Sequence, residues 1–214
     1  MITISGIGWI AKKKHGTLLK KFSGQYENAE NLYSQLSEKK IFRWPVKNFE
    51  RFDAASKIAC CSAALALNDA GLSYAQEQKQ NMGIFGTFNE GSARTNYAYF
   101  SDYIENGRKL ARGNLFIYTL PSSPLAETSI CFGFNGPLMY LLFEENGLIH
   151  LLTMAQAAII GKECEKVMAI YRNEEDAVSF ILENSVTAGK NPELENIIQK
   201  INNIIDIKEI ISSI

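Results

Sequence analysis

The sequence is poor in the residues from which most metal sites and many catalytic sites are built. It has only two histidines, His15 and His150, and four cysteines in 214 residues. Two of the cysteines are sequence neighbours and no two form a Cys-x-x-Cys pair, which argues against zinc and disulfide patterns. We therefore expect no metal site, no cofactor, and free thiols in a reducing cytoplasm. The cysteines are Cys60, Cys61, Cys131 and Cys164.

An excess of charge and long apolar runs are also missing. The 22 basic and 23 acidic side chains leave a net charge of -1, so neither nucleic acid nor an anionic membrane is expected as a partner. No apolar run reaches the length of a membrane span, and the first residues do not resemble a signal peptide. One basic cluster near the N-terminus fits either a docking site for an acidic partner, such as a carrier protein, or a solvated loop. Its members are Lys12, Lys13, Lys14, His15, Lys20 and Lys21.

The residues that are present predict one α/β domain over residues 1–214. The composition, 46% hydrophobic and 21% charged, is that of an ordinary globular protein. Strand and helix patterns alternate along the chain. We predict strands at Ile2–Ile10, Asn81–Thr87, Leu138–Phe143, Lys166–Tyr171 and Ala177–Leu182. We predict helices at Glu27–Lys39, Ala54–Ala70, Gly91–Asn106 and Leu148–Ile160, and a last one after Pro192.

Two of these helices have unusual compositions. The helix Ala54–Ala70, with Asp53 as its N-cap, consists mostly of small residues, so we expect it to pack closely against a sheet. The helix Leu148–Ile160 is apolar on nearly every side, which predicts burial all round. The layer over it would be either the isoleucine-rich C-terminal helix or a second protein chain. On such a helix, His150 is expected to be a hydrogen-bonded core residue.

Five stretches, in order, resemble the N-terminal half of β-ketoacyl synthases. The resemblance implies the thiolase-like α/β fold, with a mixed five-stranded sheet and helices on both faces. One of the stretches ends in the family's Phe-Gly-x-x-Gly-Pro pattern at residues 132–137. The five stretches are ISGIGWI (4–10), RFDAASKIACCSAALALNDAGL (51–72), NMGIFGT (81–87), LPSSPLAETSICFGFNGP (120–137) and AVSFILE (177–183).

The sequence departs from the family at the catalytic nucleophile. In active members the strand after Gly-Pro leads to a cysteine, and here that position falls on Glu145 in the turn Phe143–Gly147. The family's two catalytic histidines and lysine belong to a C-terminal half that this sequence lacks. A carboxylate is a poor acyl acceptor and opposes a developing oxyanion. We therefore expect no catalytic residue, and we interpret Glu144 and Glu145 as anions favoured at a helix N-terminus by about 0.3–1 kcal/mol.

The resemblance implies a chain-length-factor-like subunit that pairs with a full-length ketosynthase. The expected pathway is type II fatty acid, polyketide or aryl polyene biosynthesis, with an acyl carrier protein as a further partner. The expected subunit interface is Leu138, Met139, Tyr140, Leu141, Leu142 and Phe143. The expected acyl tunnel residues are Phe116, Ile117, Tyr118 and Thr119.

Two alternatives stay open at this point. One is a decarboxylase or another thioester-acting enzyme in which Glu145 does acid–base work. The other is a homodimeric acyl-binding scaffold that covers its own apolar helix.

Overall fold

The structure is a mixed β-sheet with helices on both faces. It is a computed structural model of the chain, and it describes all residues except 89, 108–112, 174–175, 186–190, 202–203 and 205. The sheet has the strand order β3-β2-β1-β7-β6-β4-β5. Strand β4 runs parallel to β5 and β6, and the other neighbours are antiparallel. The strands are β1 (Ile2–Ala11), β2 (Lys14–Thr17), β3 (Ser23–Gln25), β4 (Met82–Phe88), β5 (Leu138–Tyr140), β6 (Lys166–Asn173) and β7 (Asp176–Asn184).

The prediction of a five-stranded sheet is therefore wrong, because the sheet has seven strands. Of the additional strands, β2 lies in the segment whose basic residues suggested a loop, and β3 follows that segment. They contain only four and three residues, too few for an alternating pattern to stand out. Lys12 and Lys13 adopt positive φ angles of 48° and 63° and turn the chain from β1 into β2. His15 in β2 is completely buried, so it is not part of a basic surface.

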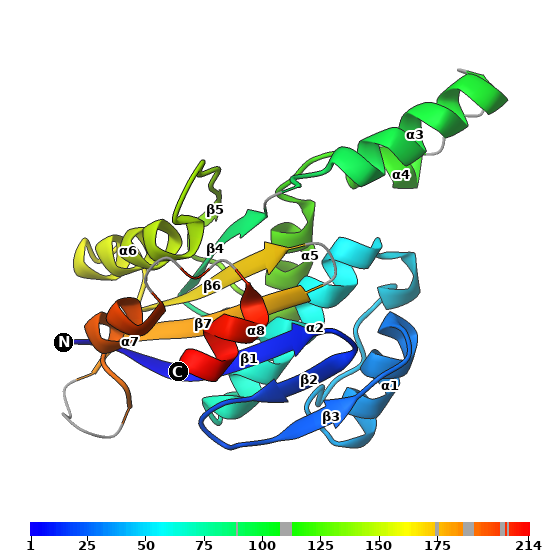
Figure 1. Cartoon of the computed structure of the whole chain (residues 1–214). Coiled ribbons are helices and arrows are strands. Elements are labelled where there is room, and N and C mark those ends of the chain that lie inside the picture. Colours follow the sequence, from blue (N-terminus) through cyan, green and yellow to red (C-terminus); the bar gives the residue numbers. More distant parts are fainter. Residues whose placement is uncertain (89, 108–112, 174–175, 186–190, 202–203, 205) are drawn as a thin grey trace.

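Helices cover the two faces of the sheet in separate groups (Figure 1). On one face α2 (Ala54–Asp69) contacts the sheet, α5 (Ser123–Phe132) packs beside it, and α1 (Ala29–Glu38) packs on α2. The other face carries α6 (Gly147–Ile160) over β6 and β4, with α7 (Leu194–Ile201) and α8 (Ile207–Ser213) over β1 and β7. A short 3₁₀ turn, Phe49–Arg51, precedes α2. The thiolase-like architecture with helices on both faces is thus confirmed.

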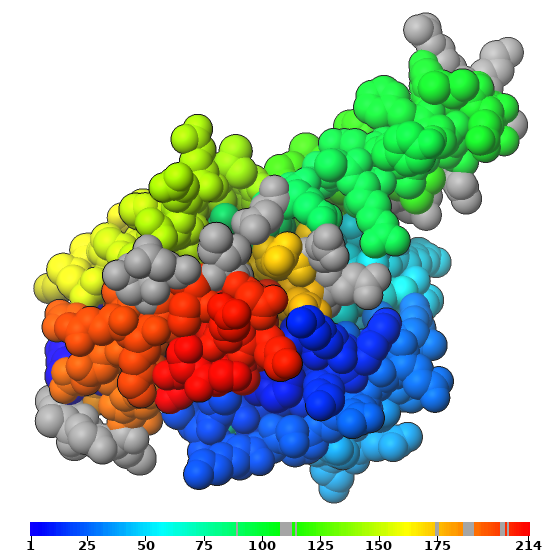
Figure 2. Space-filling view, in the orientation of Figure 1, coloured from blue at the N-terminus to red at the C-terminus, as the bar shows by residue number. Residues whose placement is uncertain are grey.

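Two further helices leave the body of the molecule. Helices α3 (Ala93–Asn106) and α4 (Gly113–Ile117) lie against each other and project away from the sheet. We call this pair the arm. Figure 2 shows it standing clear of the rest of the surface. Across the described residues, no helix is both long enough and apolar enough to cross a membrane.

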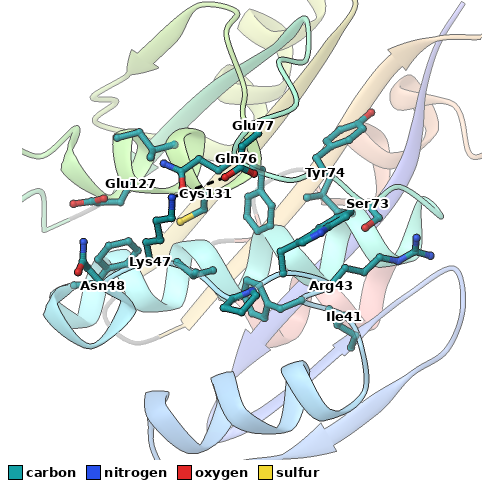
Figure 3. Close-up of a pocket in the computed structure, with 18 of the residues that line it drawn as sticks. Ile41, Arg43, Lys47, Asn48, Ser73, Tyr74, Gln76, Glu77, Glu127 and Cys131 are labelled. Carbon is teal, nitrogen blue, oxygen red and sulfur yellow. Dashed lines mark ion pairs between the residues drawn. The ribbon is translucent and has the colours of Figure 1, made fainter.

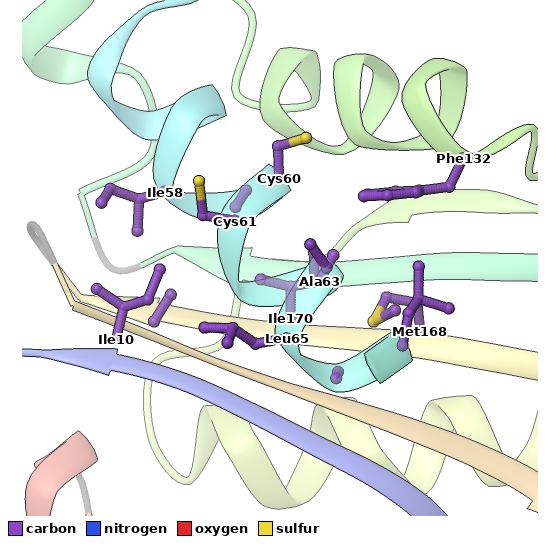
Figure 4. Close-up of a cluster of buried hydrophobic side chains, with 14 of the residues drawn as sticks. Ile10, Ile58, Cys60, Cys61, Ala63, Leu65, Phe132, Met168 and Ile170 are labelled. Carbon is purple, nitrogen blue, oxygen red and sulfur yellow. The ribbon is translucent and has the colours of Figure 1, made fainter. Parts of the chain in front are cut away.

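The close packing predicted for α2 is confirmed at two glycines of β1. A Cβ atom on Gly8 would lie 2.3 Å from the backbone nitrogen of Ala66, and one on Gly6 would lie 2.3 Å from the Ala66 carbonyl oxygen. The backbone of α2 can lie this close to β1 only because these two positions of the strand have no side chain. Asp53 caps α2 as expected, because its carboxylate accepts the Ser56 N–H at 2.8 Å. Figure 4 shows the buried cluster that α2 forms against the sheet.

Candidate functional site

The turn expected to hold a nucleophile lies between β5 and α6. Glu144 and Glu145 are both exposed there, and the helix begins at Gly147 after Asn146. Asn146 occupies the N-cap position with a φ angle of 51°, and its side chain makes no capping hydrogen bond. Among the described residues, neither glutamate side chain accepts a hydrogen bond from the helix N–H groups. The two carboxylates therefore lie near the N-terminus of α6 without capping it.

No thiol lies near this turn. Cys60, Cys61 and Cys131 belong to the core on the opposite face of the sheet. Cys164 follows the far end of α6, which at 1.5 Å per residue is about 20 Å from the turn. The turn itself contains no cysteine, and Glu145 is the residue at which the resemblance to β-ketoacyl synthases places the nucleophile.

Helix α6 is buried on one side and exposed on the other, so the isoleucine-rich C-terminal segment does not supply the layer expected over it in the described part of the chain. Helices α7 and α8 lie beside α6 on the same face of the sheet and do not cover it. Met154 is 39% exposed and Ile160 is 65% exposed. The residues turned to solvent recur at helical spacing, and we call them the exposed α6 face: His150, Thr153, Met154, Ala157 and Ile160.

His150 is consequently not the core histidine that the sequence suggested. It is exposed, and its ring stacks on Phe143 with centroids 5.2 Å apart and an interplanar angle of 28°. The apolar residues around His150 in the sequence suggested that it is buried. It is exposed because no other described segment covers this side of α6.

The predicted interface segment Leu138–Phe143 is an edge and not a buried strand. Only Leu138–Tyr140 pair with the sheet, through β4, and in the described chain β5 has no neighbour on its other side. Leu142 is 73% exposed. An apolar run after Gly-Pro suggests a strand inside the sheet. Whether the strand lies inside the sheet or at its edge depends on the order of the strands, which cannot be read from the run alone.

The Phe-Gly-x-x-Gly-Pro pattern explains where β5 starts. Gly133 ends α5 in the left-handed region with a φ angle of 68°, and a Cβ there would lie 2.2 Å from the Gln78 carbonyl oxygen. A Cβ on Gly136 would lie 2.7 Å from the Gly83 nitrogen of β4. Both glycines therefore let the chain pass directly against its neighbours before it enters the sheet edge.

The arm exposes its apolar side chains. Tyr97 and Ile104 of α3 are each 78% exposed. The Tyr99 ring lies 5.6 Å from that of Phe116 and links α3 to α4. Phe100, Phe116 and Ile117 are exposed as well. The arm therefore presents a second apolar surface, separate from the exposed α6 face.

Two cavities lie near the four predicted tunnel residues. The first, of about 400 Å³, is bounded by Asp53 of α2, by Arg172 at the end of β6 and by Tyr118. We call it the strand-end cavity. The second, of about 580 Å³, lies on the outer side of α2 and α5 and is lined by Ile117, Tyr118 and Cys131 among others (Figure 3). We call it the outer cavity.

The structure thus brings two of the four predicted tunnel residues to a cavity wall. Tyr118 is buried and lines both cavities, and Ile117 lines the outer one. Phe116 and Thr119 line neither of the two. The Tyr118 hydroxyl donates to Glu127 Oε1 at 3.2 Å, and burial raises the pKa of both side chains.

Arg172 is the residue of this site that the sequence did not indicate. It comes directly after the predicted strand Lys166–Tyr171, yet it belongs to β6 and is buried, with its guanidinium 4.9 Å from the centre of the Phe88 ring. Burial lowers its pKa, while the charges of Asp53 and Glu90 oppose that shift. The pairing of β6 with both β4 and β7 encloses Arg172, and no local sequence signal reports such pairing.

Comparisons with known proteins agree with this architecture. The family model described as "Beta-ketoacyl synthase, N-terminal domain" matches residues 5–169. A comparison with curated proteins finds no match. Similar solved structures include the ishigamide ketosynthase/chain length factor, with 11% identity and a TM-score of 0.61 over 90% of this chain and 64% of the other.

Two more solved structures show the same fold. One is ketosynthase ApeO in complex with its chain length factor ApeC from Xenorhabdus doucetiae, at 16% identity and a TM-score of 0.50 over 86% of this chain and 79% of that chain. The other is a type II PKS acyl-carrier protein in complex with its ketosynthase bound to the hexaketide. It shares 11% identity and a TM-score of 0.56 over 86% of this chain and 58% of that chain.

The chain spans less than two thirds of the length of the ishigamide and hexaketide-complex chains that it matches. At these identities the solved structures establish the fold alone. The family model covers well over half of the chain, and with the Phe-Gly-x-x-Gly-Pro turn and the strand order it leads to one conclusion: the chain belongs to the β-ketoacyl synthase family and carries its N-terminal domain.

Proposed function

We propose that this protein is a non-catalytic, chain-length-factor-like subunit that pairs with a full-length, active β-ketoacyl synthase. The pathway would be type II fatty acid, polyketide or aryl polyene biosynthesis in the cytoplasm. The observation that carries the proposal is the exposed α6 face, which lies on the helix that directly follows the edge strand β5.

The chemistry of the turn supports the non-catalytic part. Condensation requires a thiolate that accepts the acyl group and donors that stabilise the oxyanion. Glu145 stands at the nucleophile position, exposed and negatively charged. Acyl transfer to a carboxylate there would give a labile mixed anhydride in place of a thioester, and the carboxylate would repel the developing negative charge. The subunit therefore acts through its partner's active site.

The exposed surfaces support the pairing part. Met154, Ala157 and Ile160 form an apolar stripe in water, and such surfaces on soluble proteins commonly mark interfaces. The unpaired edge of β5 offers backbone N–H and C=O groups beside it. Two of the similar solved structures contain a ketosynthase with a chain length factor, and a third contains an acyl-carrier protein, which is the further partner we propose.

Co-expression with a full-length ketosynthase from the same organism tests the proposal. We expect a stable complex of one copy of each chain on size-exclusion chromatography with light scattering. Ile160→Glu, on the exposed α6 face, is expected to reduce complex formation by at least tenfold. Ile130→Glu is the matched control, because Ile130 is similarly exposed but lies on α5, on the other face of the sheet.

The same measurement separates this proposal from the homodimeric scaffold. A stable homodimer that ignores the ketosynthase and is disrupted by Ile160→Glu would overturn the pairing with a ketosynthase and favour the scaffold. A monomer that binds neither itself nor the ketosynthase would overturn both.

A further inference from the structure

Three of the four cysteines gather where α5 packs on α2. Cys60 and Cys61 of α2 are completely buried in the core on that face of the sheet. Cys131 of α5 is only partly buried and packs against the same core. Figure 4 shows the Cys60 side chain extending from α2 toward α5. All three thiols are free.

Cys60 and Cys131 stand on two helices that pack on each other, and the Cys131 thiol is a side-chain neighbour of Cys60. Burial and then the Cys131 thiol raise the pKa of Cys60 well above that of an ordinary cysteine. Burial also raises the pKa of Cys61. The two α2 thiols are therefore protonated at rest, and a protonated thiol is a poor nucleophile. Because Cys60 and Cys61 are also completely buried and Cys131 is only partly buried, a reagent from solvent meets Cys131 first.

Cys131 is also the thiol that a small reagent can reach. It forms part of the wall of the outer cavity, whose volume is about 580 Å³ (Figure 3). Cys60 is not among the residues that line this cavity and has no exposed surface. An accessible thiol in front of a buried second thiol is the arrangement in which a first oxidation product is captured as a disulfide.

We propose that Cys131 and Cys60 form an oxidative modification site that closes to a disulfide on exposure to a peroxide. The Cys131 sulfur attacks one peroxide oxygen, the O–O bond breaks, and a sulfenic acid and one water form. The Cys60 sulfur then attacks the sulfenic sulfur, and the hydroxyl group leaves with the Cys60 proton as a second water. The two thiols are oxidised by two electrons in total, and the peroxide is reduced to water.

The bond would join two helices that otherwise only pack on each other. Helix α5 leads directly into the Phe-Gly-x-x-Gly-Pro turn and the edge strand β5, so the disulfide would also fix the start of that strand relative to α2. This site is independent of the proposed partnership with a ketosynthase.

Mass spectrometry of the purified full chain tests the site. After treatment with hydrogen peroxide, we expect a loss of two hydrogen masses that a thiol reductant reverses, and a linked peptide pair containing Cys60 and Cys131. Cys131→Ser and Cys60→Ser should abolish the change. Cys164→Ser, which removes a thiol on the other face of the sheet, should leave it intact.

The peptide map of the unsubstituted chain decides the question even if a variant fails to fold. A link between Cys61 and Cys131, a disulfide between two molecules, or sulfinic acid at Cys131 with Cys60 still reduced would each overturn the proposal. An unchanged mass under conditions that oxidise glutathione completely would do so too.

Discussion

The carboxylate of Asp69 accepts the backbone N–H of Ile7 at 2.9 Å, and this bond ties the last turn of α2 to the middle of β1. The same buried carboxylate accepts the N–H groups of Leu19 at 3.1 Å and Lys20 at 2.8 Å. One side chain thus holds a helix, a strand and the connection after β2 at a single point. Such charge-assisted bonds are stronger than neutral ones, and each donor would be left unsatisfied without it.

Replacing Asp69 with alanine is therefore expected to destabilise the fold strongly. Three buried or half-buried N–H groups lose their acceptor, which costs roughly 3 kcal/mol or more of the free energy of unfolding. Urea unfolding followed by circular dichroism measures it. Asp206→Ala, which removes the N-cap of the short helix α8, is the control and should cost only about 1 kcal/mol. Equal losses in the two variants would contradict the role of Asp69.

Gly8 should tolerate no side chain. A Cβ there would meet the Ala66 nitrogen at 2.3 Å and the Ser62 carbonyl oxygen at 2.4 Å, so Gly8→Ala must push α2 off the sheet. We expect a loss of about 3 kcal/mol or more in thermal or urea unfolding, at the upper end of overpacking effects. Gly113→Ala, with nothing within 4 Å of the added atom, is the matched control and should be neutral or slightly stabilising. A stable Gly8→Ala protein would mean that α2 sits farther from β1.

His15 should make the protein sensitive to mild acid. It is completely buried, neither ring nitrogen has a hydrogen-bond partner in the described residues, and burial followed by the charge of Lys39 lowers its pKa to about 4. The unfolded chain binds this proton below about pH 6.5, whereas the folded chain resists it until about pH 4. Above about pH 6.5 His15 therefore does not lower the free energy of unfolding. As the pH falls from 6.5 toward 4, the free energy of unfolding decreases by at most about 3 kcal/mol.

The variant His15→Phe separates this effect from the titration of carboxylates. It keeps a ring beside Phe22 and Tyr26 and removes the titrating group. Urea unfolding at pH 7 and pH 4.5 should show a smaller loss for the variant than for the unsubstituted chain. Parallel losses in the two proteins would assign the acid sensitivity to other groups.

Glu145→Gln should leave catalysis by the complex unchanged. Since Glu145 is exposed and does no chemistry in our proposal, the rate of chain extension by the ketosynthase complex should stay within about twofold, well under the tenfold that 1.4 kcal/mol represents. The assay follows product formation from malonyl thioesters. A large loss, together with malonyl decarboxylation by the isolated chain, would favour the acid–base alternative instead.

The elements that the sequence predicts well are those with a strong local signal. The strand predicted at Ile2–Ile10 and the small-residue helix that Asp53 caps both occur where expected. The C-terminal helix is an exception, because it stops at Ile201 and a new helix with Asp206 as its N-cap begins at Ile207. Its isoleucines continue at helical spacing, so their pattern hides the break.

The features that sequence reasoning missed depend on contacts between distant segments. His15 is buried by Phe22 and Tyr26, although it stands in a run of lysines. Arg172 is enclosed by the pairing of three strands, and His150 is exposed because no layer covers α6. Glu145 has no local signal of its own, because an exposed glutamate before a helix is common, and only its distance from Pro137 relates it to the β-ketoacyl synthase pattern.

The exposed α6 face also restricts the shape of whatever covers it. Its residues rise and fall in size along the helix, with the long side chains of Met154 and Ile160 on either side of the small Ala157. Helices pack by setting the ridges of one into the grooves of the other, at axis distances of about 8–10 Å and a few preferred crossing angles. A matching helix must place a large side chain over Ala157 and small ones over Met154 and Ile160. The spacing of side-chain sizes on one helix thus discriminates between partners of equal hydrophobicity.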